Sequence, residues 1–371
     1  MMAGRYPGRV GLQQRVLPSY RATFLDMLAA ACDGGLSVFA GKPLPSEGIQ
    51  PVEKLNVATY VQARNRNIND PASPFYICWQ SGLLRWLETW QPDMLIVEAN
   101  PRYFSLPRAI HWMHSQGGKV IGWGLGEPHI TGPLASYRQW ERLRLLRSLD
   151  AIIAYSNLGA QQYQQLGFPS ERIFVAFNAV ELAPTCAPPA RPPYFSDHPV
   201  LLFVGRLQSR KRLDLLLKAC AALPANSQPH LVIVGDGPAR AELERLASQI
   251  YPLAEFAGTR QGAELEPYFA AADLFVLPGS GGLAVQQAMA HGLPVMVARG
   301  DGTQDDLVRQ ANGWQVPPDD LPALTNLLGQ VLSDPARLRE MGEASYRIAA
   351  EEINVESMVS VFIRVLNSFN S

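Results

Sequence analysis

The chain has 371 residues, of which 47% are apolar and 18% are charged, and its formal net charge is -1. This composition excludes a wholly disordered chain, and the balanced charge argues against a nucleic-acid-binding surface along the whole chain. The four cysteines lie far apart, no apolar run reaches the ~18–20 residues that cross a bilayer, and the N-terminus lacks an apolar signal core, so we expect a cytoplasmic protein without disulfides.

The first 182 residues alternate short apolar runs with helical patterns. We expect strands at 9–17, 36–40, 93–98, 119–123, 150–155 and 173–177. We expect helices at 22–31, 81–90, 107–115 and 137–147, and a long irregular connection over 41–75, which is rich in Pro, Asn and Asp. Strands that alternate with helices form a parallel sheet with helices on both faces. In such sheets ligands bind at the carboxyl ends of the strands, so the predicted functional edge consists of the loops at 17–21, 99–104 and 124–130.

A proline-rich segment separates this part from a second alternating series. Five prolines in the eleven residues 183–193 exclude helix and central strand, so we expect a linker over 183–198 between domains 1–182 and 199–350. In the second series we expect strands at 200–204, 231–234, 274–277 and 294–297. We expect helices at 212–223, 238–249, 263–271, 284–291, 320–333 and 355–366. The sequence therefore predicts an α/β protein with two Rossmann-like, doubly wound parallel-sheet domains.

A basic turn follows the first strand of the second domain. The strand ends at Val204, Gly205 permits a tight turn, and Arg206 and Lys211 precede the next helix together with two further arginines. Arginine presents a planar fork and lysine a point charge to phosphate oxygens, and the N–H groups of a helix start favour anions. The turn is therefore a predicted phosphate site, with a solvated basic helix start as the alternative.

Two glycine-containing loops follow later strands of this domain. Gly235-Asp236-Gly237-Pro238 places a proline at a predicted helix start, and a plain turn is the simpler explanation. The stretch 277–283 holds three glycines between a strand and a helix, where the backbone can approach a phosphate, although a tight packing turn is the alternative. No Gly-Lys-Ser/Thr sequence follows, so this is not a Walker loop.

Together these motifs resemble the donor domain of family 4 glycosyltransferases, which have the GT-B fold. The resemblance rests on the order and spacing of 205–211, 234–238 and 278–295, and 177–181 resembles the family's N-G-V-D junction at the end of its acceptor domain. It covers residues 150–350 well, whereas the first 149 residues fit in architecture alone. The resemblance implies two domains facing a cleft and a C-terminal helix, 351–371, that packs back on the first domain.

The resemblance also implies a reaction and the residues that carry it. A retaining transferase of this family moves a sugar from a nucleotide-diphosphate sugar, commonly linked to UDP or GDP, to an acceptor hydroxyl in the cleft, without a metal or a further cofactor. Arg206 and Lys211 would stabilise the negative charge that develops on the leaving diphosphate. The other positions implied for donor binding are Gly205, Gly237, Gly258, Gly281, Gly282, Leu283 and Gln287.

One departure from the family pattern concerns two glutamates that normally flank the glycine loop. Gly279 and Gln287 stand at these positions. Gln287 can hydrogen-bond a ribose through its amide, but Gly279 cannot replace a carboxylate that contacts the donor sugar. Either donor recognition is rebuilt elsewhere, or the sugar differs, or catalysis is weakened. The segment 301–306 is a candidate replacement, with N-capping of a helix by Thr303 as the alternative.

The acceptor side offers fewer motifs. The family often has a histidine near the reacting sugar, whereas this chain has Gly122-Trp123-Gly124 in the matching region. Glu127 is therefore the candidate catalytic carboxylate and His129 an acceptor-side group, with exposed loop residues as the alternative. The further acceptor-side candidates on the predicted functional edge are Tyr20, Arg21, Asn100 and Arg102, whose alternatives are helix capping and surface charge.

The helix at 137–147 carries four arginines beside Trp140 and three leucines. A membrane-surface face for a lipid-linked acceptor is one interpretation, and a docked helix with a solvated basic side is the other. We expect a glycan, lipid-linked or small-molecule acceptor, no nucleic acid, and at most peripheral membrane contact. The rival hypothesis is a catalytically weakened nucleotide- or sugar-binding protein with a regulatory or scaffold role, and sugar epimerisation or phosphorolysis on the same fold ranks last.

Overall fold

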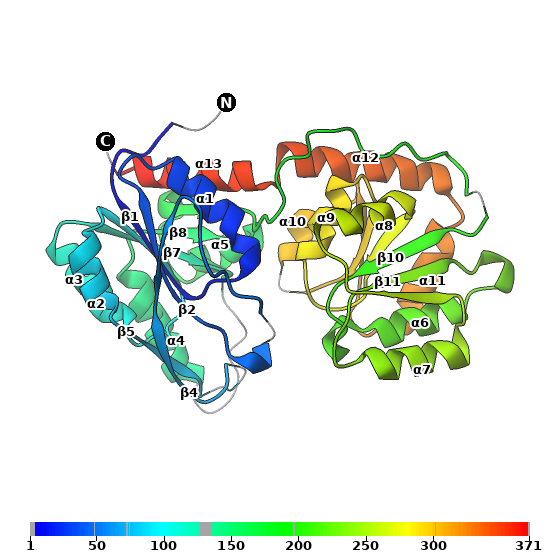
Figure 1. Cartoon of the computed structure of the whole chain (residues 1–371), viewed down its shortest axis with the longest axis horizontal. Helices are drawn as coiled ribbons and strands as arrows, with labels where there is room; N and C mark the ends of the chain where they lie inside the picture. The colour runs from blue at the N-terminus through cyan, green and yellow to red at the C-terminus, as the bar shows by residue number, and fades with distance from the viewer. Residues whose placement is uncertain are drawn as a thin grey trace. The chain divides into compact units, whose positions relative to one another are not determined.

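The computed structural model describes residues 4–47, 49–71, 73, 75–126, 135–195, 197–300 and 302–369. The chain forms two compact units, unit 1 from Met1–Val180 with Val355–Ser371 and unit 2 from Glu181–Asn354 (Figure 1). Each unit has its own parallel sheet. Among the described residues, no helix is both long and apolar enough to cross a membrane.

Unit 1 is built on a seven-stranded sheet in which all neighbouring strands are parallel. The strand order is β3 (Thr59–Gln62), β2 (Leu36–Gly41), β1 (Val10–Val16), β6 (Met94–Glu98), β7 (Lys119–Gly124), β8 (Ala151–Ala154) and β9 (Ile173–Val175). The central strands are buried on both faces, which explains their near-continuous apolar sequences. The strand order reverses between β1 and β6, so the loops after these two strands flank a crevice at the carboxyl edge.

Helices from both ends of the chain cover this sheet. They are α1 (Ala22–Ala30), α2 (Leu83–Trp90), α3 (Leu106–Ser115), α4 (Ala135–Arg147), α5 (Asn157–Gln165) and α13 (Val355–Asn367). Figure 1 shows α13, in red, beside α1, in blue. The ring of Phe362 on α13 lies 4.9 Å from that of Phe24 and 5.1 Å from that of Trp123, measured between centroids. The apolar face of the last helix therefore completes the core of unit 1.

The prediction of an irregular connection over 41–75 is wrong. This stretch contains β3, which extends the parallel sheet, and β4 (Arg64–Ile68), which pairs antiparallel with β5 (Ile77–Ser81). The sequence of β4 alternates Arg with Asn and has a single apolar residue, so no hydrophobic pattern marks it. Its strand conformation depends on hydrogen bonds to β5, whose side chains of Cys78 and Gln80 are buried.

Unit 2 has a six-stranded parallel sheet with the order β12 (Ala254–Gly258), β11 (His230–Val234), β10 (Val200–Val204), β13 (Leu274–Leu277), β14 (Val295–Ala298) and β15 (Gly313–Val316). Its helices are α6 (Leu213–Ala221), α7 (Arg240–Ile250), α8 (Glu266–Ala271), α9 (Leu283–Ala290), α10 (Thr303–Leu307), α11 (Leu321–Val331) and α12 (Pro335–Glu351). Both units thus have the doubly wound parallel architecture that the sequence predicts. The predicted elements omit β15, which is short and partly exposed, and α12.

The proline-rich segment packs along unit 2. The guanidinium of Arg191 donates hydrogen bonds to the carbonyl oxygens of Phe269 at 2.7 Å, Ala272 at 2.9 Å and His291 at 3.1 Å. Burial lowers the pKa of Arg191 to about 10. The boundary between the two units falls at 180–181, before the prolines, and again at 354–355.

Candidate functional site

The reversal of strand order in unit 2 lies between β10 and β13, which are hydrogen-bonded neighbours. Because the strands are parallel, the loops after Val204 and Leu277 leave the same edge of the sheet. In open α/β sheets this switch point is where ligands bind. The structure therefore brings the basic turn at 205–211 and the glycine loop at 278–282 together.

Three hydrogen bonds join these two loops. The Nζ of Lys211 donates to the carbonyl oxygen of Ser280 at 2.7 Å, and the Nη1 of Arg210 donates to the Oγ of Ser280 at 3.2 Å. The backbone N–H of Ser280 donates in turn to the carbonyl oxygen of Arg210 at 3.0 Å. Each loop thus fixes the position of the other.

The two predicted phosphate ligands differ in their surroundings. Burial, and the charge of Arg210 nearby, lower the pKa of Lys211 to about 8. Its protonated form is therefore destabilised, and a bound anion would stabilise it. The side chain of Arg206 is exposed, and within the described residues its guanidinium has no hydrogen-bond or ion-pair partner. One cation is therefore anchored beside the glycine loop and the other is available to a ligand.

Close contacts with the basic turn explain two glycines of the loop. A Cβ atom at Gly279 would lie 2.2 Å from the carbonyl oxygen of Arg210, and one at Gly281 would lie 2.2 Å from the Nζ of Lys211. Gly282 is the N-cap of α9 without a side-chain cap, which leaves the first N–H groups of the helix for a ligand. No side chain of any kind fits at Gly279 in this arrangement, including the family's glutamate.

Gln287, the second position that departs from the family pattern, is hydrogen-bonded to a carboxylate. Its Nε2 donates a hydrogen bond of 2.8 Å to the Oε1 of Glu181, and both side chains are partly buried. Glu181 ends the segment that resembles the family's N-G-V-D junction. A carboxylate thus lies next to the predicted ribose position, supplied by a residue 106 positions earlier in the chain.

The segment after β14 supports the glycine loop from another side. The Nε2 of Gln304 on α10 donates to the carbonyl oxygen of Gly281 at 3.0 Å. The alternative role of Thr303 as a helix N-cap is wrong, because α10 begins at Thr303 and its N-cap is Gly302 in the left-handed conformation. Asp301 lies outside the described residues.

The other glycines predicted to bind the donor have packing roles. A Cβ at Gly237 would lie 2.3 Å from the carbonyl oxygen of Leu207, so the turn after β11 needs a glycine against the basic turn. Gly205 donates its N–H to the carbonyl oxygen of Val234, and Gly258 accepts from the N–H of Gly235. The helix that was predicted to start at Pro238 starts two residues later, with α7.

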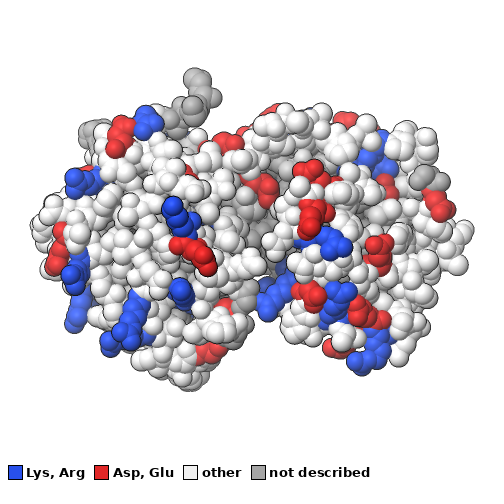
Figure 2. Space-filling view, viewed as in Figure 1, with Lys and Arg blue, Asp and Glu red and all other residues white. Residues whose placement is uncertain are grey.

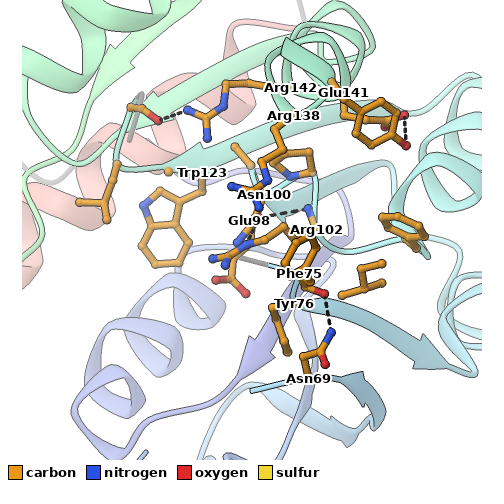
Figure 3. A pocket seen from close by; sticks show the side chains of 18 of the residues that line it. Asn69, Phe75, Tyr76, Glu98, Asn100, Arg102, Trp123, Arg138, Glu141 and Arg142 are labelled. Atoms are coloured by element: carbon orange, nitrogen blue, oxygen red, sulfur yellow. Dashed lines mark hydrogen bonds between the residues drawn. The ribbon is translucent and has the colours of Figure 1, made fainter. Parts of the chain in front are cut away.

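Unit 1 holds a separate cavity of about 740 Å³ at the carboxyl ends of β6, β7 and β8 (Figure 3). Asn100 and Arg102 both line it, and the Oδ1 of Asn100 accepts hydrogen bonds from the backbone N–H and Nε of Arg102 at 3.2 and 3.4 Å. The guanidinium carbon of Arg102 lies 5.5 Å from the ring centre of Tyr76. These two predicted residues are thus placed together at a cavity large enough for a ligand.

Glu98 is a lining residue that the sequence interpretation missed. It ends β6, and its carboxylate accepts hydrogen bonds from the backbone N–H of Arg15 and from the hydroxyl of Tyr103. Burial raises the pKa of Glu98. Its place as the last residue of a buried strand at the predicted functional edge was the available signal.

The other acceptor-side candidates lie elsewhere. Arg21 is buried, and its guanidinium carbon lies 4.7 Å from the ring centre of Trp123 and 5.7 Å from that of Tyr155. Both rings line the cavity, whereas Tyr20 is exposed beside Arg21. Glu127 and His129 lie outside the described residues.

Comparisons with known proteins agree with this arrangement. The family described as "Glycosyl transferases group 1" matches residues 198–334. The sulfoquinovosyl transferase SQD2 of Arabidopsis thaliana is 34% identical over 162 residues, which are 42% of this chain and 30% of that protein. A GDP-mannose-dependent alpha-(1-6)-phosphatidylinositol monomannoside mannosyltransferase of Mycolicibacterium smegmatis is 33% identical over 161 residues, 40% of this chain and 42% of that protein. The chain therefore spans less than half the length of either relative.

A solved structure resembles almost the whole chain. Anabaena Alr3699/HepE in complex with UDP has a TM-score of 0.70 and 16% sequence identity, and the superposition covers 97% of this chain and 99% of that one. At 16% sequence identity, this structural similarity is evidence for the fold alone.

Proposed function

The chain belongs to the group 1 glycosyl transferases and has the GT-B fold, and from this premise we propose that it is a retaining glycosyltransferase that uses a nucleotide-diphosphate sugar. The observation that carries the proposal is the joined pair of loops at the switch point of unit 2. There the side chain of Arg206 is exposed, and Lys211 is fixed beside a glycine loop that opens a helix. This arrangement suits a diphosphate that gains charge during the reaction.

In the proposed reaction, the acceptor hydroxyl oxygen forms a bond to the anomeric carbon while the bond from that carbon to the diphosphate oxygen breaks. The electron pair of the broken bond stays on the nucleoside diphosphate, and the hydroxyl proton passes to that diphosphate. Arg206 and Lys211 would bind the oxygens on which the charge collects, and the N–H groups of Gly282 and Leu283 would add hydrogen bonds. The new bond takes the face of the old one, which is retention.

The nucleotide is proposed from the relatives. The mannosyltransferase is named for GDP-mannose, and the HepE structure contains UDP. We therefore infer a GDP- or UDP-linked sugar, bound without a metal, as the donor. Gln287, with Glu181 behind it, would contact the ribose hydroxyls through the amide oxygen, which the hydrogen bond to Glu181 leaves free.

Donor hydrolysis tests this proposal without knowledge of the acceptor. The protein is incubated with UDP- and GDP-sugars, and the released sugar is followed by proton NMR. A retaining enzyme first releases the anomer that the donor carries. Release of the opposite anomer would contradict retention, and absence of both hydrolysis and nucleotide binding across the panel would contradict the proposed function.

A second candidate function is a nucleotide-binding protein with weak or no transfer activity. The packing of Gly279 on Arg210 favours it, because no carboxylate can reach the donor sugar from that position. Nucleotide binding with no hydrolysis of any donor would support the second candidate. Hydrolysis that depends on Arg206 would support the first.

A further inference from the structure

Arg212 ends the basic turn of unit 2 in a backbone conformation that side chains rarely adopt. Its φ is 54° and its ψ is 35°, in the left-handed region, where contacts of the Cβ disfavour residues other than glycine. The residue is both the C-cap of the 3-10 helix Ser209–Lys211 and the N-cap of α6. A residue held against its backbone preference indicates that surrounding contacts stabilise the conformation.

Two carboxylates hold the guanidinium of Arg212. Its Nε and Nη2 donate to the Oδ1 and Oδ2 of Asp214 at 3.1 and 3.4 Å, and its Nη1 pairs with the Oδ1 of Asp319. Asp214 lies in the first turn of α6, whereas Asp319 lies in the connection between β15 and α11. Asp319 has a positive φ as well, of 61°. The ion pair therefore joins two residues in the left-handed region that belong to separate segments of the chain.

The energy of the ion pair alone does not explain its presence. The side chains of Arg212 and Asp319 are 31% and 66% exposed, and water and salt screen such pairs, so they contribute little to stability. Exposed pairs are also common on unit 2. Figure 2 shows acidic and basic side chains next to one another over the part that Figure 1 labels α7. What distinguishes the pair of Arg212 is its place, next to the predicted phosphate ligand Lys211.

The backbone that Arg212 fixes carries Lys211 against the glycine loop. The Nζ of Lys211 donates to the carbonyl oxygen of Ser280 at 2.7 Å. A Cβ at Gly279 would lie 2.7 Å from the Cα of Lys211 and 2.5 Å from its carbonyl carbon, so the two backbones are in direct contact. The N–H of Arg212 closes the turn by donating to the carbonyl oxygen of Ser209 at 3.1 Å. A rotation of the backbone at Arg212 would therefore separate Lys211 from both contacts.

We propose that Arg212 is a positioning residue of the phosphate site, and that its pair with Asp319 holds the basic turn in the conformation that keeps the ammonium group of Lys211 beside the glycine loop. Arg212 binds no ligand in this role, because its guanidinium already pairs with two carboxylates. The positioning is a property of the ligand-free protein, whereas its effect on a bound diphosphate rests on the proposed function. The pair connects the phosphate site to the β15–α11 connection, which contains none of the residues predicted to bind the donor.

The amine reactivity of Lys211 in the ligand-free full chain tests the positioning. Acetic anhydride acylates neutral amines, and peptide mass spectrometry follows Lys211 as the pH is raised, with the exposed Lys42 as the internal reference. In the wild type the midpoint should lie at about 8, the lowered pKa of Lys211. In Asp319→Asn it should rise by about half a pH unit or more, because a released Lys211 is better solvated. Loss of a carboxylate without movement would lower the midpoint or leave it unchanged, and either result would overturn the proposal.

A control and a double variant show whether the pair itself acts. Asparagine tolerates the left-handed conformation, so Asp319→Asn removes the charge and keeps the backbone. Glu340→Gln is the matched control and should leave the midpoint unchanged, since Glu340 is 69% exposed and pairs with Arg337 on α12. Arg212→Ala should raise the midpoint at least as far as Asp319→Asn does. The addition of Asp319→Asn to Arg212→Ala should then change nothing further, and additive effects would refute the pairing.

Titration of UDP and GDP into the same proteins separates this inference from the proposed function. If the wild type binds a nucleotide, Asp319→Asn should weaken that binding by about threefold to tenfold, and Glu340→Gln should not. Equal affinity of the wild type and Asp319→Asn would show that Arg212 has no positioning role in the phosphate site, and the proposed function would stand. If the wild type binds neither nucleotide, the proposed function is wrong, and the reactivity of Lys211 alone decides the positioning.

Discussion

The pair formed by Gln287 and Glu181 makes a quantitative prediction about the substitution Gln287→Glu. This change installs the residue that the family normally has at this position. On the sequence alone a ribose-binding role would tolerate it. In the structure, however, the Nε2 of Gln287 donates to the Oε1 of Glu181 at 2.8 Å, so the substitution replaces a hydrogen bond by two facing carboxylates.

The size of the effect follows from elementary electrostatics. Two unit charges that relax to a separation of about 4 Å repel each other by about 1 kcal/mol in water and by about 4 kcal/mol at an effective dielectric constant near 20. Both side chains are partly buried, so we expect a loss of about 2 kcal/mol in the free energy of unfolding at neutral pH. Repulsion raises the pKa of one carboxyl group in the folded state above its unfolded value. The lost stability should therefore return as the pH falls through that raised pKa.

Urea denaturation at neutral and mildly acidic pH measures this loss. The reversed pair, Gln287→Glu combined with Glu181→Gln, is the matched control because it restores one amide opposite one carboxylate. It should recover most of the stability at neutral pH, and retained nucleotide affinity in it would support the ribose assignment. Wild-type stability in the single variant at neutral pH, or no recovery in the reversed pair, would refute the pairing.

Three further predictions concern the donor loops. Arg206→Ala should lower turnover about a hundredfold or more, because the guanidinium would no longer stabilise the charge on the leaving diphosphate. Its Tm should not change, because the exposed side chain has no partner among the described residues. Wild-type turnover would exclude the phosphate role. Nucleotide affinity should fall as the pH rises through about 8, the lowered pKa of Lys211, and the Lys211→Met variant should bind weakly and lack this step. In the same range, from about 8 to the ordinary lysine pKa of 10.5, the ligand-free wild type should gain stability relative to that variant, since the unfolded chain then binds more protons. Gly279→Ala should lower the free energy of unfolding, measured by urea denaturation, by about 1–3 kcal/mol, because the new Cβ would meet the carbonyl oxygen of Arg210. Gly282→Ala is the control and should stay within about 0.5 kcal/mol of the wild type, because the nearest atom to its Cβ is the Cδ1 of Leu307 at 3.7 Å.

The sequence predicts the elements whose burial is uniform and whose ends carry glycine or proline. β10 and β13 are short apolar runs bounded by Gly205 and Pro278, and both strands form where expected. β4 has no such run, because its pairing with β5 and not the burial of its own side chains makes it a strand. The helix α12 begins with the side chain of Asp334 accepting a hydrogen bond from the N–H of Arg337, a capping signal that was present in the sequence.

The candidate site likewise has a part that the sequence predicts and a part that it does not. Arg206, Lys211 and the glycine loop carry local signals, and the order of the parallel strands brings them together. The contact between Gln287 and Glu181 joins residues 106 positions apart, at the start of unit 2 and on α9. Such a contact is set by tertiary packing, so neither residue shows it in the sequence.

Isothermal titration of UDP and GDP into the wild-type protein and into Arg206→Ala tests most directly whether unit 2 binds a nucleoside diphosphate at its switch point. One of the two nucleotides should bind the wild type, and the substitution should weaken it by about tenfold to a hundredfold, as expected for the loss of a charge-assisted contact. Equal affinity of both proteins for the nucleotide, or no binding of either nucleotide to the wild type, would contradict the account.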